Sequence, residues 1–225
     1  MKNSSSVEPP LKRFSGVEKS KMEIILSLCA AYLLGSIPTS YIMGKLTQGI
    51  DIRKFGSGNV GATNALRILG TKIGIFTLIV DIGKGVLAVN ITRYIINQPS
   101  DLIVILAGVL AIFGHIFTIF LRFKGGKGVA TSAGVFIALA PIPTVIAFSV
   151  FIVTVWLSKF VSLGSITAAI ALFLAELVIN IVNSFTDPEI LIFTFFISLF
   201  IIIRHRANIH RLLEGNENKI SFKKK

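Results

Sequence analysis

Three short stretches of this chain combine glycine with hydroxyl, amide and basic residues, a mixture that suits phosphate binding. The first runs FGSGNVGATN from residue 55 to 64, with an arginine one turn later. Glycines let backbone N–H groups approach an anion, polar side chains add donors, and the following helix N-terminus favours negative charge. We expect a phosphate site, with candidate residues Ser57, Gly58, Asn59, Gly61, Thr63, Asn64 and Arg67.

The second stretch is FKGGKGVAT, from residue 123 to 131, preceded by His115. It is not a nucleotide-binding P-loop, because Leu121 stands where the first glycine of that motif belongs and Gly128 where Ser or Thr should follow the lysine. A glycine-rich turn with a lysine at a helix N-terminus still binds phosphate. The candidate residues are Gly125, Gly126, Lys127 and Gly128. We interpret His115, inside an apolar run, as a helix-packing residue.

The third stretch is RHRANIHR, from residue 204 to 211. In a helix, His205, Asn208 and Arg211 share one face at i,i+3 spacing, which suits oxyanion binding or proton transfer. The alternative is a basic segment lying on anionic lipid, which gives His205 and Asn208 no role.

The sequence lacks the residue patterns that indicate metal-dependent or serine-nucleophile catalysis. No Cys or His pairs have zinc spacing, no carboxylate cluster suits magnesium, and no Gly-x-Ser-x-Gly elbow offers an activated serine. We therefore expect no metal and no cofactor. Phosphate binding without a protein nucleophile favours direct transfer between two bound substrates, catalysed by positioning and electrostatics.

The elements that position these stretches are apolar runs of transmembrane length. The chain has 225 residues, of which 53% are hydrophobic and 15% charged, and a mean hydropathy of +0.79. A span needs about 20 apolar residues, so we predict an all-α integral membrane protein, a seven-helix bundle. The segments are 22–46, 72–96, 102–121, 128–141, 143–158, 162–182 and 189–204. The Pro141–Pro143 break predicts two short helices there, and one kinked helix is the alternative.

The net charge of +12 follows membrane topology and does not indicate nucleic acid, because the basic residues lie in alternate loops between apolar runs. The positive-inside rule puts the three polar stretches and the C-terminus in the cytoplasm and the N-terminus outside. The basic residues of the N-terminal tail disagree with this orientation. Cys29 lies within the first run, where we expect it to pack in the core.

We divide the chain into a disordered polar tail (1–21), a membrane domain (22–211) and a basic cytoplasmic tail (212–225). Within the membrane domain, Asp81 and Lys84 are spaced to form an i,i+3 ion pair. A structural role in helix packing is the favoured interpretation of this pair. Glu176, within a later apolar run, could likewise have either a structural or a catalytic role, and the sequence offers no obvious partner for it.

Together, the three stretches resemble the bacterial acyl-phosphate-dependent glycerol-3-phosphate acyltransferases, the PlsY family. The resemblance is carried by FGSGNVGATN with Arg67, by HIFTIFLRFKGGKGVAT from residue 115, and by IRHRANIHRLLEGNE from residue 203. It covers nearly all of the chain after residue 22. One departure is Thr118, where the family usually has proline.

The resemblance implies a bacterial inner-membrane enzyme with its active site on the cytoplasmic face. Such an enzyme transfers a fatty acyl group from acyl phosphate to the 1-hydroxyl of glycerol 3-phosphate, without coenzyme A or a covalent intermediate. The implied catalytic residues are Ser57, Arg67, Lys127, His205 and Asn208, and Glu214 or Glu217 matches a structural acid. His205 is assigned to hydrogen bonding first and to proton acceptance second, because a substrate phosphate is the favoured acceptor. The implied partners are both substrates, membrane lipid and a soluble enzyme that makes acyl phosphate.

Two other functions compete with acyl transfer. A transporter for a phosphorylated metabolite would use basic residues along an anion path, but it predicts ionisable residues at mid-membrane and an internal repeat. Beyond Asp81, Lys84 and Glu176, neither is evident. A membrane anchor that recruits partners through basic loops would not need Ser57, Asn64, His205 or Asn208.

Overall fold

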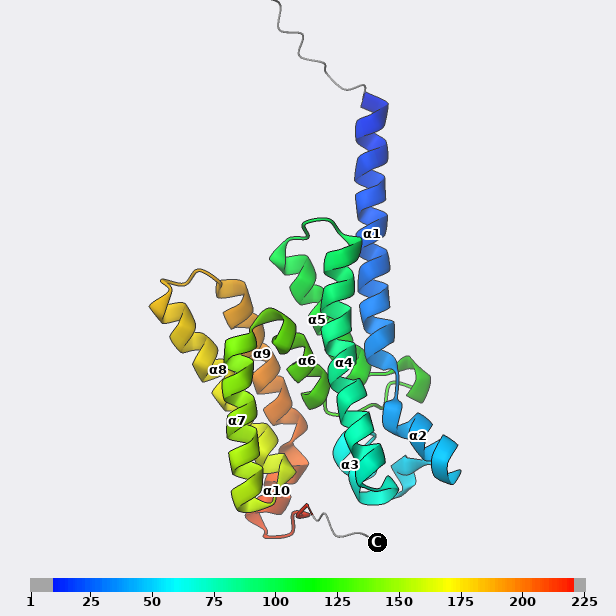
Figure 1. Ribbon diagram of the computed structural model, residues 1–225, viewed down its shortest axis with the longest axis vertical. Helices are drawn as coiled ribbons and strands as arrows, with labels where there is room; N and C mark the ends of the chain where they lie inside the picture. The colour runs from blue at the N-terminus through cyan, green and yellow to red at the C-terminus, as the bar shows by residue number, and fades with distance from the viewer. Residues whose placement is uncertain (1–9, 221–225) are drawn as a thin grey trace, which may run out of the picture.

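The computed structural model describes residues 10–220, and every regular element within them is a helix, so the predicted all-α class is confirmed. Figure 1 shows the helices α1 (Pro10–Ser36), α2 (Thr39–Gln48), α3 (Ala62–Leu69), α4 (Thr71–Ile95), α5 (Asp101–Ile116), α6 (Val129–Leu139), α7 (Pro141–Ser158), α8 (Val161–Val182), α9 (Pro188–Arg204) and α10 (Arg206–Leu213). Two 3₁₀ turns, η1 (Ile52–Lys54) and η2 (Ile119–Leu121), lie between them. The outer parts of both predicted tails, 1–9 and 221–225, lie outside the described residues.

All seven predicted apolar segments are helical. Four helices in residues 10–220 are long and apolar enough to cross a membrane, or up to six if the bent pairs α1–α2 and α9–α10 each count as one span. Of the two remaining α-helices, α3 has 8 residues and the apolar α6 has 11. Helix α6 ends at Leu139 and α7 begins at Pro141, so the two-helix interpretation of this proline-containing run is confirmed.

Two predicted boundaries at the N-terminal end are wrong. The run 22–46 is two helices bent by 43°, because Pro38 has no N–H to continue the ladder of hydrogen bonds. Helix α1 begins at Pro10, inside the segment 1–21 that the sequence predicted to be disordered. Proline is well suited to the first helical turn, and extending an existing helix is far easier than nucleating one.

The helices form two groups joined by α6. Helices α1, α4 and α5 pack together on one side, α7, α8 and α9 on the other, and α6 contacts members of both groups (Figure 1). Glycines allow the closest approaches: a Cβ added at Gly85 of α4 would overlap the Thr131 carbonyl of α6, and one added at Gly134 would overlap the Ile82 carbonyl. Small residues that let helix backbones touch are typical of membrane helix pairs.

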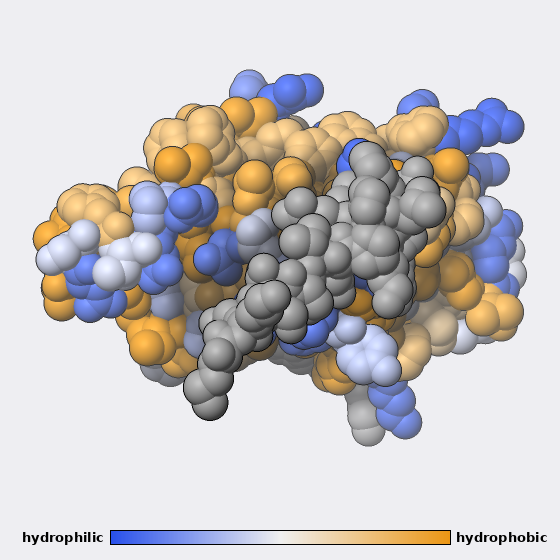
Figure 2. Space-filling model, turned by 90° about the horizontal axis from the view of Figure 1, so that it is seen from above, coloured by the Kyte–Doolittle hydropathy of each residue, from blue (hydrophilic) through white to orange (hydrophobic). Residues whose placement is uncertain are grey.

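Large apolar side chains cover the outside of the bundle. Trp156, Val145 and Ile79 are each more than 60% exposed, and Figure 2 shows hydrophobic residues over much of the surface around the rim. Hydrophobic surface this extensive is typical of a protein that lipid surrounds. Helices α2, α3 and α10 lie together at the end of the bundle opposite the start of α1 (Figure 1).

Candidate functional site

A cavity of about 540 Å³ brings the three polar stretches together. Among the predicted site residues, those that line it are Ser57, Asn59, Gly61, Thr63, Asn64, Arg67, Lys127, Gly128, His205 and Asn208. Gly58, Gly125 and Gly126 are not among the lining residues. The cavity lies between α3, α6 and α10, three helices that are far apart in the sequence.

The amide of Asn64 shapes the first stretch. This buried side chain accepts a hydrogen bond from the Ser57 backbone N–H (3.0 Å) and donates to the carbonyls of Phe55 (3.1 Å) and Asn59 (2.9 Å). Asn59 accepts from the Gly61 N–H at 2.8 Å. Gly58 has φ +71°, a conformation that favours glycine. The asparagines therefore fold the loop that presents Ser57 to the cavity.

The glycines of the second stretch lie against the end of α5. The Gly125 N–H donates to the Ile116 carbonyl (2.9 Å), and the Gly126 N–H donates to the His115 carbonyl (3.0 Å). These two N–H groups already have acceptors within the protein, so the glycines fix the path of the chain and do not present donors to an anion. Lys127 follows them directly, and Gly128 caps α6 with φ +88°.

His205 occupies the junction between α9 and α10. It is buried, and its Nδ1 lies 2.8 Å from the Ile201 carbonyl oxygen. A carbonyl can only accept, so this contact fixes the Nδ1–H tautomer and leaves Nε2 as the acceptor of the ring.

A carboxylate that the sequence left as one of two alternatives for a structural acid organises the cations of the cavity. Glu217 is buried, and it accepts hydrogen bonds from Asn208 Nδ2 (2.6 Å), Arg211 Nε (2.6 Å) and Ser162 Oγ (2.8 Å). Asn208 in turn accepts from Lys127 Nζ. Of the two acids that matched the family position, Glu217 is the one at the site. Glu214 is exposed and pairs with His210 at 2.9 Å.

Residues beyond 211, which the sequence assigned to a tail, also contact the bundle. Residues 214–220 return to the bundle: Glu217 joins the site, the Asn218 carbonyl accepts from Arg67 (2.9 Å), and the Ile220 N–H donates to the Lys159 carbonyl (2.8 Å). The sequence also gave no sign of Ser162, which lies 55 residues from its partner. No spacing pattern connects residues that meet only through helix packing.

Positive charge dominates the polar part of the cavity, where two arginine nitrogens are among the buried atoms that lack partners. Arg67, Lys127, Arg204 and Arg211 line it, against Asp81 and Glu217. Nε of Arg67 and Nε of Arg204 are buried without a hydrogen-bond acceptor. Unsatisfied cationic donors in a cavity favour an anionic ligand that would accept from them.

Burial shifts the pKa values of these groups. It lowers the pKa of Lys127 to about 8, although the nearby Glu217 acts in the opposite direction. Burial also lowers the pKa of Arg67. For Glu217, burial raises the pKa, but the hydrogen bonds from Asn208, Arg211 and Ser162 outweigh it and hold the pKa below its ordinary value.

The rest of the cavity is apolar. Its wall includes Leu78, Phe136, Val145, Phe148 and Leu172, from α4, α6, α7 and α8. Val145 and Phe148 are 66% and 54% exposed, so this arm reaches the lipid-facing surface. A cationic pocket continuous with such an arm fits an amphiphile that has an anionic head. Among the described residues, no group of three His, Cys, Asp or Glu side chains is placed to hold a metal ion.

Comparison with known proteins identifies the family. The family model described as glycerol-3-phosphate acyltransferase matches residues 25–215. The chain belongs to this family. A glycerol-3-phosphate acyltransferase of Chlorobium luteolum is 42% identical, covering 90% of this chain and 99% of the relative. One of Endomicrobium trichonymphae is 48% identical, covering 89% and 98%.

Solved structures place the chain with the PlsY type of this family. It is similar to the crystal structure of PlsY (YgiH), an integral membrane glycerol 3-phosphate acyltransferase, in its glycerol 3-phosphate form. The identity is 37%, the TM-score is 0.79, and the match covers 88% of this chain and 96% of the other. The lysophosphatidic acid form of the same enzyme matches with a TM-score of 0.77.

Proposed function

We propose that this membrane acyltransferase moves a fatty acyl group from acyl phosphate to the 1-hydroxyl of sn-glycerol 3-phosphate. The products are lysophosphatidic acid and inorganic phosphate, and the reaction is the first step of phospholipid synthesis. The observation that carries the proposal is the continuity of a cationic pocket with an apolar arm that reaches the lipid-facing surface. The similar PlsY structures, in glycerol 3-phosphate and lysophosphatidic acid forms, support the same acceptor and product.

The polar residues of the cavity bind and orient the substrate phosphates in this proposal. Arg67 and Lys127 bind the phosphates of the two substrates, and their charge is stabilising in a site that excludes water. Asn208, held by Glu217, orients the Lys127 ammonium through its Oδ1. The hydroxyls of Ser57 and Thr63, which line the cavity, hold the neighbouring phosphate oxygens.

The reaction needs no protein nucleophile. The glycerol hydroxyl oxygen attacks the acyl carbonyl carbon, the bond from that carbon to the phosphate oxygen breaks, and phosphate leaves with the electron pair. The hydroxyl proton passes to the leaving phosphate. His205 Nε2 hydrogen-bonds the acceptor hydroxyl and is the second candidate for its proton. We expect no metal or other cofactor to take part.

We also propose how the protein lies in the membrane. The seven apolar segments cross it, with the N-terminus outside and the C-terminus, the site and its basic loops in the cytoplasm of a bacterial cell. The membrane is then the cell's cytoplasmic (inner) membrane. The short α6 and the bent pairs complete the seven spans that length alone does not assign. Acyl phosphate would come from a soluble enzyme on the same side.

The deciding experiment measures phosphate release by the purified protein in lipid or detergent, given palmitoyl phosphate and glycerol 3-phosphate. We expect release that requires both substrates and that collapses in Lys127→Ala and His205→Ala. Lys124→Ala is the matched control, because Lys124 is exposed in the same loop and does not line the cavity. Equal activity with palmitoyl-CoA would refute acyl phosphate as the specific donor. A folded wild-type protein that transfers no acyl group would refute the proposed acyltransferase function.

A further inference from the structure

A buried ion pair of α4 lies next to the site without being used by the proposed chemistry. Asp81 Oδ1 and Lys84 Nζ are 2.9 Å apart, and the side chains are 1% and 4% exposed. This confirms the i,i+3 pair expected from the sequence. Charges are costly to bury among membrane helices, so an intramembrane pair commonly marks a functional requirement.

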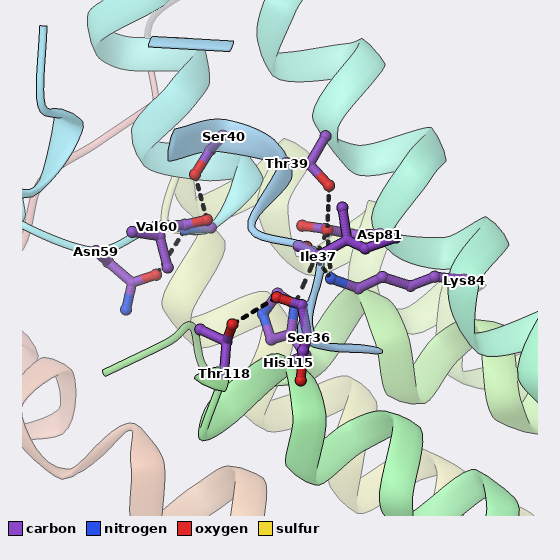
Figure 3. A network of polar contacts seen from close by, with 11 residues as sticks. Ser36, Ile37, Thr39, Ser40, Asn59, Val60, Asp81, Lys84, His115 and Thr118 are labelled. Carbon is purple, nitrogen blue, oxygen red and sulfur yellow. Dashed lines mark hydrogen bonds and ion pairs between the residues drawn. The ribbon is translucent and has the colours of Figure 1, made fainter. Parts of the chain in front are cut away.

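The pair holds the break between α1 and α2. Lys84 Nζ donates to the Ile37 carbonyl at 3.0 Å, and Thr39 Oγ1 donates to Asp81 Oδ1 at 3.1 Å (Figure 3). A helix break leaves backbone carbonyls without their helical partners, and an unsatisfied polar group is costly inside a membrane. The ammonium therefore bonds a backbone carbonyl at the break, and the carboxylate accepts from the hydroxyl of the first residue of α2.

Ser40, the residue after Thr39, connects the break to the first glycine-rich stretch by a hydrogen bond. Ser40, adjacent to Thr39, donates from its hydroxyl to the Val60 carbonyl, and both residues are buried. Val60 follows Asn59, whose amide folds the loop of Ser57. Figure 3 shows these contacts within one polar network that also includes Asp81 and His115.

The other side of the pair faces the second glycine-rich stretch. His115 Nδ1 lies 3.9 Å from Asp81 Oδ1, and the ring is buried. Its Nε2 lies so close to Gly126 that a Cβ added there would overlap it. The His115 carbonyl also accepts from the Gly126 N–H. His115 therefore contacts the residue before Lys127 with both ring and backbone.

We propose that Asp81, Lys84 and His115 are positioning residues that hold the two phosphate-binding stretches in register with each other. The inference rests on the proposed function of those stretches. Through Thr39 and Ser40 the unit fixes the loop of Ser57, and through His115 it fixes Gly126 and hence Lys127. A glycine-rich segment has little stiffness of its own, so contacts from a rigid helix supply it.

The test compares His115→Ala, His115→Gln and the charge-neutral pair Asp81→Asn with Lys84→Met. Glu176→Gln is the control, because Glu176 is also a buried carboxylate of a membrane helix, bonded only to Asn180 of its own helix and absent from the cavity wall. Two quantities are measured on each purified protein. They are amide hydrogen exchange of residues 57–61 and 124–128 relative to α8, and kcat/KM for glycerol 3-phosphate.

We expect faster exchange confined to residues 124–128 in His115→Ala, because His115 contacts Gly126, and to residues 57–61 in the double variant, because the pair holds the break next to that loop. We also expect kcat/KM to fall about 10- to 100-fold in both, the size of effect that a displacement near 1 Å produces. His115→Gln should recover part of the loss, and Glu176→Gln should change neither quantity. Unchanged exchange at the expected stretch in either variant, or faster exchange spread equally over α8, would overturn the proposal. Exchange needs no turnover, so an inactive wild type would refute the proposed function separately.

Discussion

Lys127 is a half-buried cation whose charge changes within the range of working pH, because its pKa is about 8. Phosphate binding requires the ammonium form. Below pH 7 the side chain stays charged, and above pH 8 it progressively loses its proton. We expect the Kd of glycerol 3-phosphate to rise about tenfold from pH 7 to pH 9 as the charged fraction falls. Calorimetric titration at each pH checks this.

Lys127→Arg provides the control for that pH dependence. Arginine remains charged across this pH range. The Kd of the variant for glycerol 3-phosphate should therefore not change with pH, even if its affinity is lower overall. A wild-type Kd that stays constant to pH 9 would contradict the role given to Lys127. Bound phosphate favours the ammonium, so at pH 8.5 binding should also take up protons from the buffer.

Glu217 holds Asn208 and Arg211 through its charge as well as its shape. Glu217→Gln keeps the volume but turns one acceptor into a donor that faces other donors. Hydrogen bonds to charged groups contribute about 1.5–3 kcal/mol, so we expect kcat/KM to fall about 10- to 150-fold. Steady-state kinetics measures this. The exposed Glu214→Gln should stay within about twofold of wild type, and equal losses in the two variants would contradict the assignment.

At the scale of elements, the contact of α4 with α6 places the second glycine-rich stretch. Gly85→Ala would push a methyl group into the Thr131 backbone, whereas Gly83→Ala, on the same helix, meets nothing within 4 Å. We expect Gly85→Ala to lower the free energy of unfolding by about 1–3 kcal/mol and the thermal midpoint by about 2–12 °C. Gly83→Ala should leave both unchanged. Thermal unfolding in one detergent compares them. Equal midpoints would mean that this contact does not limit the packing.

Element boundaries show which interactions a sequence reveals. The apolar runs and the Pro141 turn were predicted because both are local patterns. The bend at Pro38 was not predicted, although the proline itself is a local signal. The Ile37 carbonyl at the bend accepts a hydrogen bond from Lys84, which lies 47 residues away in the sequence, and no local pattern reveals that contact. For the site, residue types in three stretches predicted Lys127 and His205. Ser162 and the carbonyls that bind Gly125 and Gly126 depend on packing that no local pattern encodes.

At the scale of the whole molecule, the proposed orientation makes a labelling prediction. In a Cys29→Ser background, a cysteine at Gln98, in the loop between α4 and α5, should react with an impermeant maleimide on intact spheroplasts. A cysteine at Lys124 should react only after the membrane is opened. Both residues are exposed, so access across the membrane decides the result. The reverse pattern would invert the orientation and place the site outside.

The short α6 has a consequence for the bilayer itself. Its 11 residues span about 16 Å at 1.5 Å per residue, roughly half of a hydrocarbon core. Lys127 precedes that helix, so in the proposed orientation we expect the reacting phosphates to lie deeper than the ends of the longer helices around them. We then expect the lipid beside the cavity mouth to be thinner than the surrounding bilayer. Membranes made from longer or shorter acyl chains should change the turnover of this enzyme even when no substrate is altered.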